Sequence, residues 1–230
     1  MYPIVIAAKS NSSRISKKNF RNFHSGKSLV DFSLDLAFSL DPNQHVILST
    51  DHLNYISDYP FIFHRREASL AHKDTPIIDV LIDIINTYEL HSSKYILLLQ
   101  PTSPFRTQSH LREFTQLISS SVQSNPNTLL TVFSVYKVED AHPARMYQID
   151  DGHLKPLDSE LAELQCQFLP NVYHRNGGFY CFSIDAILSG SLYTELQIPY
   201  IMSIESSINI DTPLDFEFAQ YLADKSDLFK

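Results

Sequence analysis

Short apolar runs alternate with helix-like segments along the first 138 residues, and no other pattern in the chain restricts the fold as strongly. Strands that alternate with helices predict βαβ units, and therefore an α/β fold with a parallel sheet and helices on both faces. A length of 230 residues suits one domain, residues 1–230. The strand-like runs are residues 2–8, 45–50, 59–64, 94–100 and 129–138, and the helix-like segments are residues 28–40, 74–90 and 109–122.

The alternation weakens after residue 138 and returns at residues 200–210. The intervening loops and short strands predict a small elaboration of the domain at about residues 136–183. Helix starts are marked by residue type. Thr75 is the expected N-cap of residues 74–90, with Pro76 at the first helical position. A second capping signature consists of Thr212, Pro213 and Asp215.

Positive charge is concentrated just after the first predicted strand. Residues 9–21 carry five Lys and Arg side chains, whereas the first carboxylate is Asp31 and the whole chain has a net charge of -8. Ligands of parallel sheets bind at the carboxyl ends of the strands, where residues 9–20, 49–51 and 100–103 are expected to meet. A cationic loop at such an edge suits a polyphosphate, and a solvated charged face is the alternative.

Several classes of function are disfavoured by the composition. The cationic loop lacks the Gly residues of a P-loop or a Rossmann fingerprint. Net negative charge argues against general nucleic-acid binding, and the longest apolar run, residues 95–105, is too short and polar to cross a membrane. No basic segment precedes the first apolar run, as a secretory signal requires. Cys166 and Cys181 form no disulfide framework, and Cys181 is expected in the core, so we expect a reduced, cytoplasmic protein.

Segments in order along the chain resemble the signatures of the CMP-acylneuraminate (sialic acid) cytidylyltransferases. The cationic loop, AAKSNSSRISKKNF, is similar to the family's P-A-R-S-G-S-K-R-I-P-K-K-N. Further similar segments are VILSTD, RREASLAHKDTP, LLLQPTSPFR, VYHRNGGFY and SINIDTPLDF. The matches span residues 3–216. The resemblance therefore implies that the whole chain has the family's fold, which is nucleotide-diphospho-sugar transferase-like and Rossmann-like, with a mostly parallel sheet flanked by helices.

The resemblance implies a nucleotidyl transfer, in which the anomeric hydroxyl of a nonulosonic acid attacks the α-phosphate of CTP and pyrophosphate leaves. Because negative charge spreads over phosphate oxygens, such a reaction needs Mg²⁺ and fixed cations. The resemblance assigns catalytic roles to Lys18, Asp211 and Arg14. It also implies a homodimer that forms through the elaboration, with sugar sites that draw residues from both subunits.

Binding residues are implied in the same way. Those near the nucleotide are Lys9, Ser12, Lys17, Asn19, Arg66 and Thr75. An amide reads sugar hydroxyls as donor and acceptor, and a guanidinium suits a carboxylate. The expected contacts of the sugar acid are Gln100, Arg145, Arg175 and Asn176. Simpler roles remain open: a helix cap for Thr75, a turn for Gln100 and residues 175–178, and a surface position for Arg145.

The expected Mg²⁺ ligand is Asp211, because Mg²⁺ prefers hard carboxylate oxygens. Asn209 and Asp51 are weaker candidates. The chain departs from the family pattern at chemically important positions. Asn209 replaces the first Asp of a D-x-D segment, and the other departures are Lys9 for Arg, Ser13 for Lys, Ser16 for Pro, and Cys166 near a family Arg.

Losing one charge-assisted contact costs roughly 1.5–3 kcal/mol, or about 10- to 100-fold. Two alternatives to an active sialic-type enzyme therefore stay open. One is a catalytically impaired relative that binds nucleotide or sugar or acts as a regulator. The other is a nucleotidyltransferase for another sugar acid such as Kdo, against which the KKN and RNG segments argue.

Overall fold

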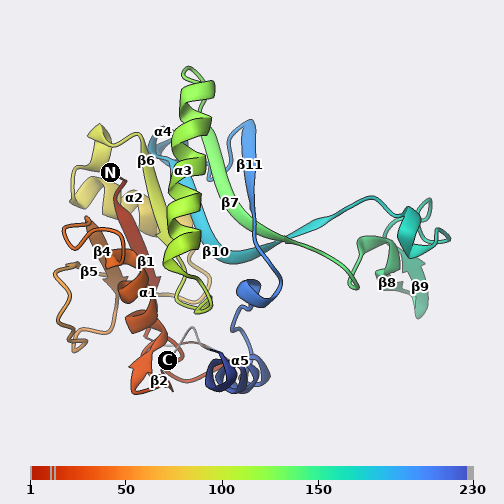
Figure 1. Ribbon diagram of the computed structural model, residues 1–230, viewed down its shortest axis with the longest axis horizontal. Helices are drawn as coiled ribbons and strands as arrows, with labels where there is room; N and C mark the ends of the chain where they lie inside the picture. Colours follow the sequence, from red (N-terminus) through yellow and green to blue (C-terminus); the bar gives the residue numbers. More distant parts are fainter. Residues whose placement is uncertain (1, 11, 13, 227–230) are drawn as a thin grey trace.

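The computed structural model describes residues 2–10, residue 12 and residues 14–226. Its main sheet has seven strands in the order β11-β7-β10-β6-β1-β4-β5 (Figure 1). These strands are β1 (Ile4–Ala8), β4 (Val46–Thr50), β5 (Ile62–Arg65), β6 (Tyr95–Leu99), β7 (Leu130–Lys137), β10 (Tyr173–Ser183) and β11 (Leu196–Ile201). The helices are α1 (Leu29–Phe38), α2 (Ile77–Thr87), α3 (Gln108–Ser124), α4 (Ile184–Leu188) and α5 (Pro213–Lys225). All neighbouring strands pair in parallel except β10, which is antiparallel to β6 and β7, so the predicted mostly parallel α/β sheet is confirmed.

Both faces of the sheet are buried beneath helices. Successive side chains of a strand point to opposite faces. In β1, Ile4 and Ile6 pack in the cluster that includes α1 and α3, whereas Val5 packs in the cluster that includes α2 and α4. Figure 1 shows α3 crossing in front of the sheet. Strands covered on both faces have no polar side, which explains why β1 and β6 read as continuous apolar runs.

A third cluster fixes α5 beneath the loop that follows β1. Phe23, in the hairpin of β2 (Asn22–His24) and β3 (Lys27–Ser28), meets Phe216 of α5 edge to face at 5.6 Å between ring centroids. The helix begins as predicted, because Thr212 Oγ1 accepts from the Asp215 backbone N–H and the Asp215 carboxylate accepts from the Thr212 N–H. This packing brings the segment before α5 beside the cationic loop.

The predicted elaboration is too long at its C-terminal end. β10 begins at Tyr173 and is a central strand of the main sheet, so the elaboration is confined to about residues 138–172. Within it, the exposed hairpin of β8 (Tyr147–Asp150) and β9 (His153–Pro156) projects far from the sheet (Figure 1).

The predicted N-cap of α2 is also wrong. Pro76 occupies the cap, and Thr75 Oγ1 instead donates to the Ser69 carbonyl oxygen at 3.0 Å. Cys181 is fully buried, as predicted, and burial raises the pKa of its thiol, whereas Cys166 is exposed. None of the helices in the described part of the chain has the length and apolar character needed to span a membrane.

Candidate functional site

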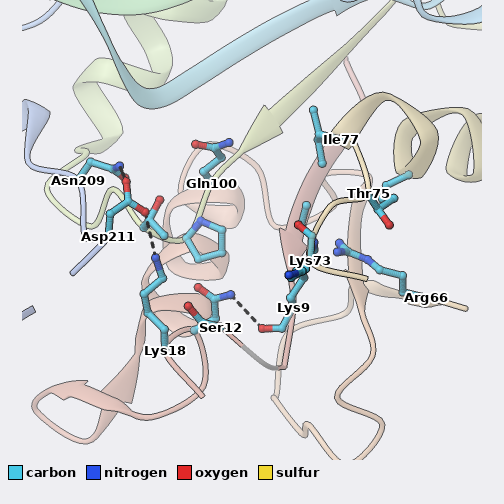
Figure 2. Close-up of a pocket in the computed structure, with 15 residues that line it drawn as sticks. Lys9, Ser12, Lys18, Arg66, Lys73, Thr75, Ile77, Gln100, Asn209 and Asp211 are labelled. Carbon is cyan, nitrogen blue, oxygen red and sulfur yellow. Dashed lines mark hydrogen bonds and ion pairs between the residues drawn. The ribbon is translucent and has the colours of Figure 1, made fainter. Parts of the chain in front are cut away.

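A pocket of about 460 Å³ lies at the carboxyl ends of β1 and β6 (Figure 2). Of the three polar segments predicted to meet there, residues 9–20 and 100–103 contribute to its lining and residues 49–51 do not. It brings together nine of the predicted site residues: Lys9, Ser12, Lys18, Asn19, Arg66, Thr75, Gln100, Asn209 and Asp211. Lys73 also lines it. The lining therefore holds four cationic side chains and one carboxylate, in a protein whose net charge is negative. This balance favours a polyanionic ligand.

Lys18 forms one end of the pocket together with Asp211. Its Nζ donates to the Ile210 carbonyl oxygen at 2.6 Å and lies 3.3 Å from Asp211 Oδ1 (Figure 2). Burial lowers the pKa of Lys18, although the Asp211 carboxylate acts in the opposite direction. The segment that precedes α5 therefore holds the Lys18 ammonium group in a partly desolvated position. There, water screens the electrostatic attraction between this group and a bound anion only weakly.

The turn of the cationic loop separates its neighbouring lysines. Lys17 adopts a left-handed backbone with φ of 51° and is exposed, whereas Lys18 directly after it is buried. Arg14 is exposed as well. The pocket therefore receives Lys18 but neither Arg14 nor Lys17, so their predicted roles in catalysis and nucleotide binding have no support in this geometry. Ser13 lies outside the described residues.

Lys9 and Arg66 form the opposite end of the pocket (Figure 2). Lys9 Nζ donates to the His72 carbonyl oxygen at 2.6 Å. Arg66 is buried, and its Nη2 donates to the Ser49 carbonyl oxygen at 3.0 Å. Burial lowers the pKa of Lys9, and the positive charge of Arg66 lowers it further. An anion bound between these cations would relieve that repulsion.

Asn19 closes the cationic loop from inside. Its Nδ2 donates to the Lys9 carbonyl oxygen at 3.1 Å. Its buried Oδ1 has no hydrogen-bond partner within the described residues, an arrangement that is costly unless a ligand or water donates to it.

The possible metal ligands are arranged differently from the prediction. Asn209 Nδ2 donates to Asp211 Oδ2 at 2.7 Å, and Asn209 Oδ1 accepts from Ser103 Oγ at 3.4 Å. Asn209 thus turns its amide nitrogen toward Asp211 and its oxygen away. The described residues contain no group of three His, Cys, Asp or Glu side chains that could hold a metal ion. One carboxylate, from Asp211, fits Mg²⁺ only where substrate phosphates and water complete the shell, as is usual for this ion.

Asp51, the other weak metal candidate, has a structural partner. Its two carboxylate oxygens accept from the Ser10 backbone N–H at 2.6 Å and from Ser10 Oγ at 2.5 Å. Burial alone would raise the pKa of Asp51, but these hydrogen bonds outweigh it and leave the pKa below its ordinary value. Asp51 therefore fastens the start of the cationic loop.

A second pocket of about 550 Å³ adjoins the first and shares Ile77, Gln100 and Asn209 with it. Its wall is rich in aromatic rings, and the Arg175 guanidinium lies 5.5 Å from the ring centroid of Tyr193 and donates to its hydroxyl. Gln100 therefore borders both pockets, and Arg175 lies in the second, consistent with the prediction that both contact a second ligand.

Asn176 does not reach either pocket. It is 2% exposed, its Oδ1 accepts from Ser134 Oγ at 2.5 Å and from the Gly178 N–H at 3.0 Å, and its Nδ2 donates to Ser207 Oγ at 2.8 Å. The predicted sugar contact is therefore corrected to a structural role. Its amide fixes the turn that carries Gly177.

Arg145 also lies away from both pockets. It precedes β8 in the projecting elaboration and donates to the carbonyl oxygens of Ala162 and Leu164. A single chain therefore does not bring Arg145 to Gln100, and its predicted carboxylate contact requires a second subunit.

Two residues that support the site were not assigned a role from the sequence. Arg106 is buried, and its Nη1 donates to the Gly178 carbonyl oxygen at 2.7 Å, which ties the segment after β6 to the turn in β10. Burial lowers the pKa of Arg106 to about 9. Lys73 lies in the RREASLAHKDTP segment, but the binding roles of that segment were assigned to Arg66 and Thr75 alone. Arg106 ends the LLLQPTSPFR segment, which was a usable signal.

Several known proteins are similar to this chain in sequence and in fold. The sequence profile of the family described as cytidylyltransferase matches residues 4–165. A CMP-N,N'-diacetyllegionaminic acid synthase from Legionella pneumophila is 29% identical over 231 residues, covering 95% of this chain and 94% of that protein. An N-acylneuraminate cytidylyltransferase from Streptococcus agalactiae is 28% identical over 224 residues, which cover 94% of this chain and 52% of that longer protein.

The fold is also shared with a solved structure of CMP:2-keto-3-deoxy-manno-octonic acid synthetase complexed with CTP. The TM-score is 0.69 at 14% sequence identity, and the similarity covers 97% of this chain and 98% of that one. At 14% sequence identity, this similarity is evidence for a shared fold alone. The profile match, in contrast, spans most of the chain and contains the cationic loop, Arg66 and Gln100. The chain therefore belongs to the cytidylyltransferase family of nucleotidyltransferases.

Proposed function

We propose that this protein transfers CMP from CTP to the anomeric hydroxyl of a nonulosonic acid. The observation that carries the proposal is the pair of adjoining pockets: a cationic one at the carboxyl ends of the strands, and an aromatic one that contains Arg175, with Gln100 between them. The triphosphate occupies the first, between Lys18 and the Lys9–Arg66 end, and the sugar acid occupies the second.

The reaction forms one bond and breaks one. The anomeric oxygen bonds to the α-phosphorus of CTP, the bond from that phosphorus to the β-phosphate oxygen breaks, and the hydroxyl proton passes to water. Lys18 neutralises charge on the phosphate oxygens as it develops, because it is fixed in place before the substrate arrives. Gln100 orients the sugar acid at the boundary of the pockets. Asp211 is the residue that would hold Mg²⁺, which supplies further charge neutralisation on the triphosphate.

A homodimer in the cytoplasm completes the proposal. Exposed apolar side chains gather in the elaboration, among them Ile149, Leu154 and Phe168, and such a patch on a projecting element favours a protein partner. A second subunit would cover this surface and is the source from which Arg145 would reach the sugar acid.

The test is an assay of pyrophosphate release with CTP, Mg²⁺ and a panel of sugar acids. The panel contains N,N'-diacetyllegionaminic acid, for which the Legionella relative is named, together with N-acetylneuraminic acid and Kdo. We expect turnover with a nonulosonic acid and formation of a CMP-sugar. Turnover with Kdo and with no nonulosonic acid would contradict the proposal that the acceptor is a nonulosonic acid. Binding of CTP without formation of any product would favour the catalytically impaired alternative.

Gly177→Ala is expected to raise KM for the sugar acid about tenfold, because a Cβ at this position would lie 2.9 Å from Gln100 Oε1 and would displace that amide. Gly177 also has φ of 73°, which strains any L side chain. The matched control is Gly190→Ala, where φ is 90° but no atom lies within 4 Å of the added Cβ. KM for both substrates and thermal unfolding check the result. Equal effects of the two substitutions on KM would contradict it.

Asn209→Asp is expected to increase the stabilisation of the protein by Mg²⁺ in the absence of substrates. The new carboxylate would face Asp211, whose Oδ2 lies 2.7 Å from the present amide nitrogen, and two close carboxylates repel each other unless a cation lies between them. We expect Tm below wild type without Mg²⁺ and a larger rise in Tm on adding it. Asn171→Asp, on the exposed elaboration, controls for added charge. Identical Mg²⁺-dependent shifts in both variants would exclude Asp211 as a ligand.

A further inference from the structure

A row of polar side chains lies behind Arg66, outside the residues so far assigned to the site. Arg66 Nε donates to Ser49 Oγ at 3.2 Å, Ser49 Oγ lies 2.9 Å from His64 Nδ1, and His64 Nε2 lies 3.0 Å from Asp83 Oδ2. Three of the four residues come from different elements, since Ser49 is in β4, His64 in β5 and Asp83 in α2, and Arg66 directly follows β5. Ser49 is 0% exposed and His64 is 3% exposed.

The chemistry of the groups gives this row one direction. An ionised Asp83 only accepts, so His64 Nε2 must carry the proton and His64 Nδ1 must be an acceptor. Ser49 therefore donates its hydroxyl hydrogen to His64 and offers a lone pair to Arg66 Nε. Burial lowers the pKa of His64, and the charge of Asp83 opposes this shift, as expected for a neutral ring. Every donor in the row then has one acceptor.

The row contains a serine, a histidine and an aspartate, but it cannot act as a nucleophilic triad. Ser49 Oγ is completely buried within the sheet, where no substrate reaches it, and it receives the N–H of Arg66. What the row does reach is the pocket, because the guanidinium of Arg66 points toward Lys9 (Figure 2).

We propose that Ser49, His64 and Asp83 are positioning residues that hold the Arg66 guanidinium in its nucleotide-binding orientation. The inference rests on the proposed function, since the ligand whose binding they promote is CTP. Both Nε and Nη2 of Arg66 donate to Ser49, so two of its N–H groups are fixed before a ligand arrives. A long side chain that is already ordered loses little conformational freedom on binding, which favours affinity.

The first experiment measures the Kd of CTP by calorimetry, without sugar acid, for folded variants of equal purity. Ser49→Ala removes the acceptor for Arg66 Nε and is expected to raise Kd about tenfold. Two substitutions of His64 divide its two roles. His64→Asn keeps an oxygen near the Nδ1 position and is expected to stay within about threefold of wild type, whereas His64→Gln keeps only the Nε2 end and is expected to weaken binding about tenfold.

Asp83 has a matched control on the same helix. Asp83→Asn offers His64 an amide that can donate, which allows the opposite tautomer and reverses the row, so Kd is expected to rise. Asp79→Asn makes the same charge change in α2, one turn earlier, at an exposed position outside the pocket. Its Kd is expected to equal that of wild type.

A second experiment needs no ligand. The Nε–H resonance of Arg66 in an NMR spectrum, assigned with Arg66→Lys, is expected to shift in Ser49→Ala and His64→Gln and to stay in place in Asp79→Asn. If neither the resonance nor the Kd changes in the folded variants of Ser49 and His64, the positioning role is excluded. If wild type binds no CTP, the proposed function fails, whereas a shifted resonance still establishes that the row orients Arg66.

Discussion

Lys18→Met is expected to lower kcat/KM for CTP by about 10²- to 10³-fold, the range found when one fixed group that stabilises developing charge is removed. Methionine keeps most of the length of the side chain and removes the ammonium group. Lys18 should matter more than Lys9 and Lys73, which are not buried, because Lys18 is buried and held by both the Ile210 carbonyl oxygen and Asp211. Continuous measurement of pyrophosphate release gives the rate.

The control for Lys18 is Lys94, which also donates to a backbone carbonyl oxygen but lies far from the pocket. Lys94 Nζ donates to the Pro126 carbonyl oxygen, but Lys94 precedes β6 and so lies at the opposite end of the sheet. Lys94→Met is expected to retain wild-type turnover. A Lys18→Met variant that keeps its Tm and wild-type turnover would show that Lys18 does not act on the phosphates.

Asp211→Asn is expected to lower kcat by about 10²-fold, corresponding to about 2.7 kcal/mol of transition-state stabilisation. The substitution preserves shape and removes the only carboxylate in the lining of the first pocket, within the described residues. It also leaves Lys18 without its counter-charge, so the position of the ammonium group becomes less defined. Both effects act on the same step, and they are therefore not additive with Lys18→Met.

Two measurements separate these effects for Asp211. The first is the rate of turnover as a function of Mg²⁺ concentration, which is expected to respond less to added Mg²⁺ in Asp211→Asn than in wild type. The second is pyrophosphate release at saturating Mg²⁺, which gives the residual rate of the variant. Glu217→Gln removes a carboxylate from an exposed position of α5 and serves as the control. An Asp211→Asn variant with the same Mg²⁺ dependence as wild type would remove Asp211 from the list of metal ligands.

The parallel strands were predictable because their burial on both faces gives uninterrupted apolar runs. β10 was placed in the elaboration because its first half, YHRNGG, reads as a polar turn, although its second half pairs with β6 and β7. The pairing of β10 with β6 joins residues 82 to 88 positions apart in the sequence, from Tyr180 with Leu98 to Ser183 with Tyr95, which local pattern does not encode. The N-cap prediction for Thr75 was wrong because its hydroxyl donates instead to the Ser69 carbonyl oxygen in the preceding loop.

Within the site, residue type was more predictable than side-chain direction. The sequence predicted that Arg175 and Asn176 both contact the sugar acid, but only the structure shows that Asn176 turns inward and Arg175 lines the second pocket. Residues 49–51 were expected at the ligand-binding edge, but the sequence indicated no partner for Ser49 and no role for His64, because the row behind Arg66 forms only when β4, β5 and α2 are packed together. Arg145 is a separate case, since the structure places it in the projecting elaboration, away from both pockets.

The shared boundary of the two pockets has a thermodynamic consequence. Ile77, Gln100 and Asn209 belong to both linings, so a molecule in one pocket contacts side chains that form the wall of the other. If binding of the first molecule orders these side chains, it changes the binding free energy of the second molecule. By thermodynamic linkage, the second molecule changes the binding free energy of the first by the same amount. If the two substrates occupy the pockets as proposed, each is an effector of the other, and the tightest binding of either is expected when both are present.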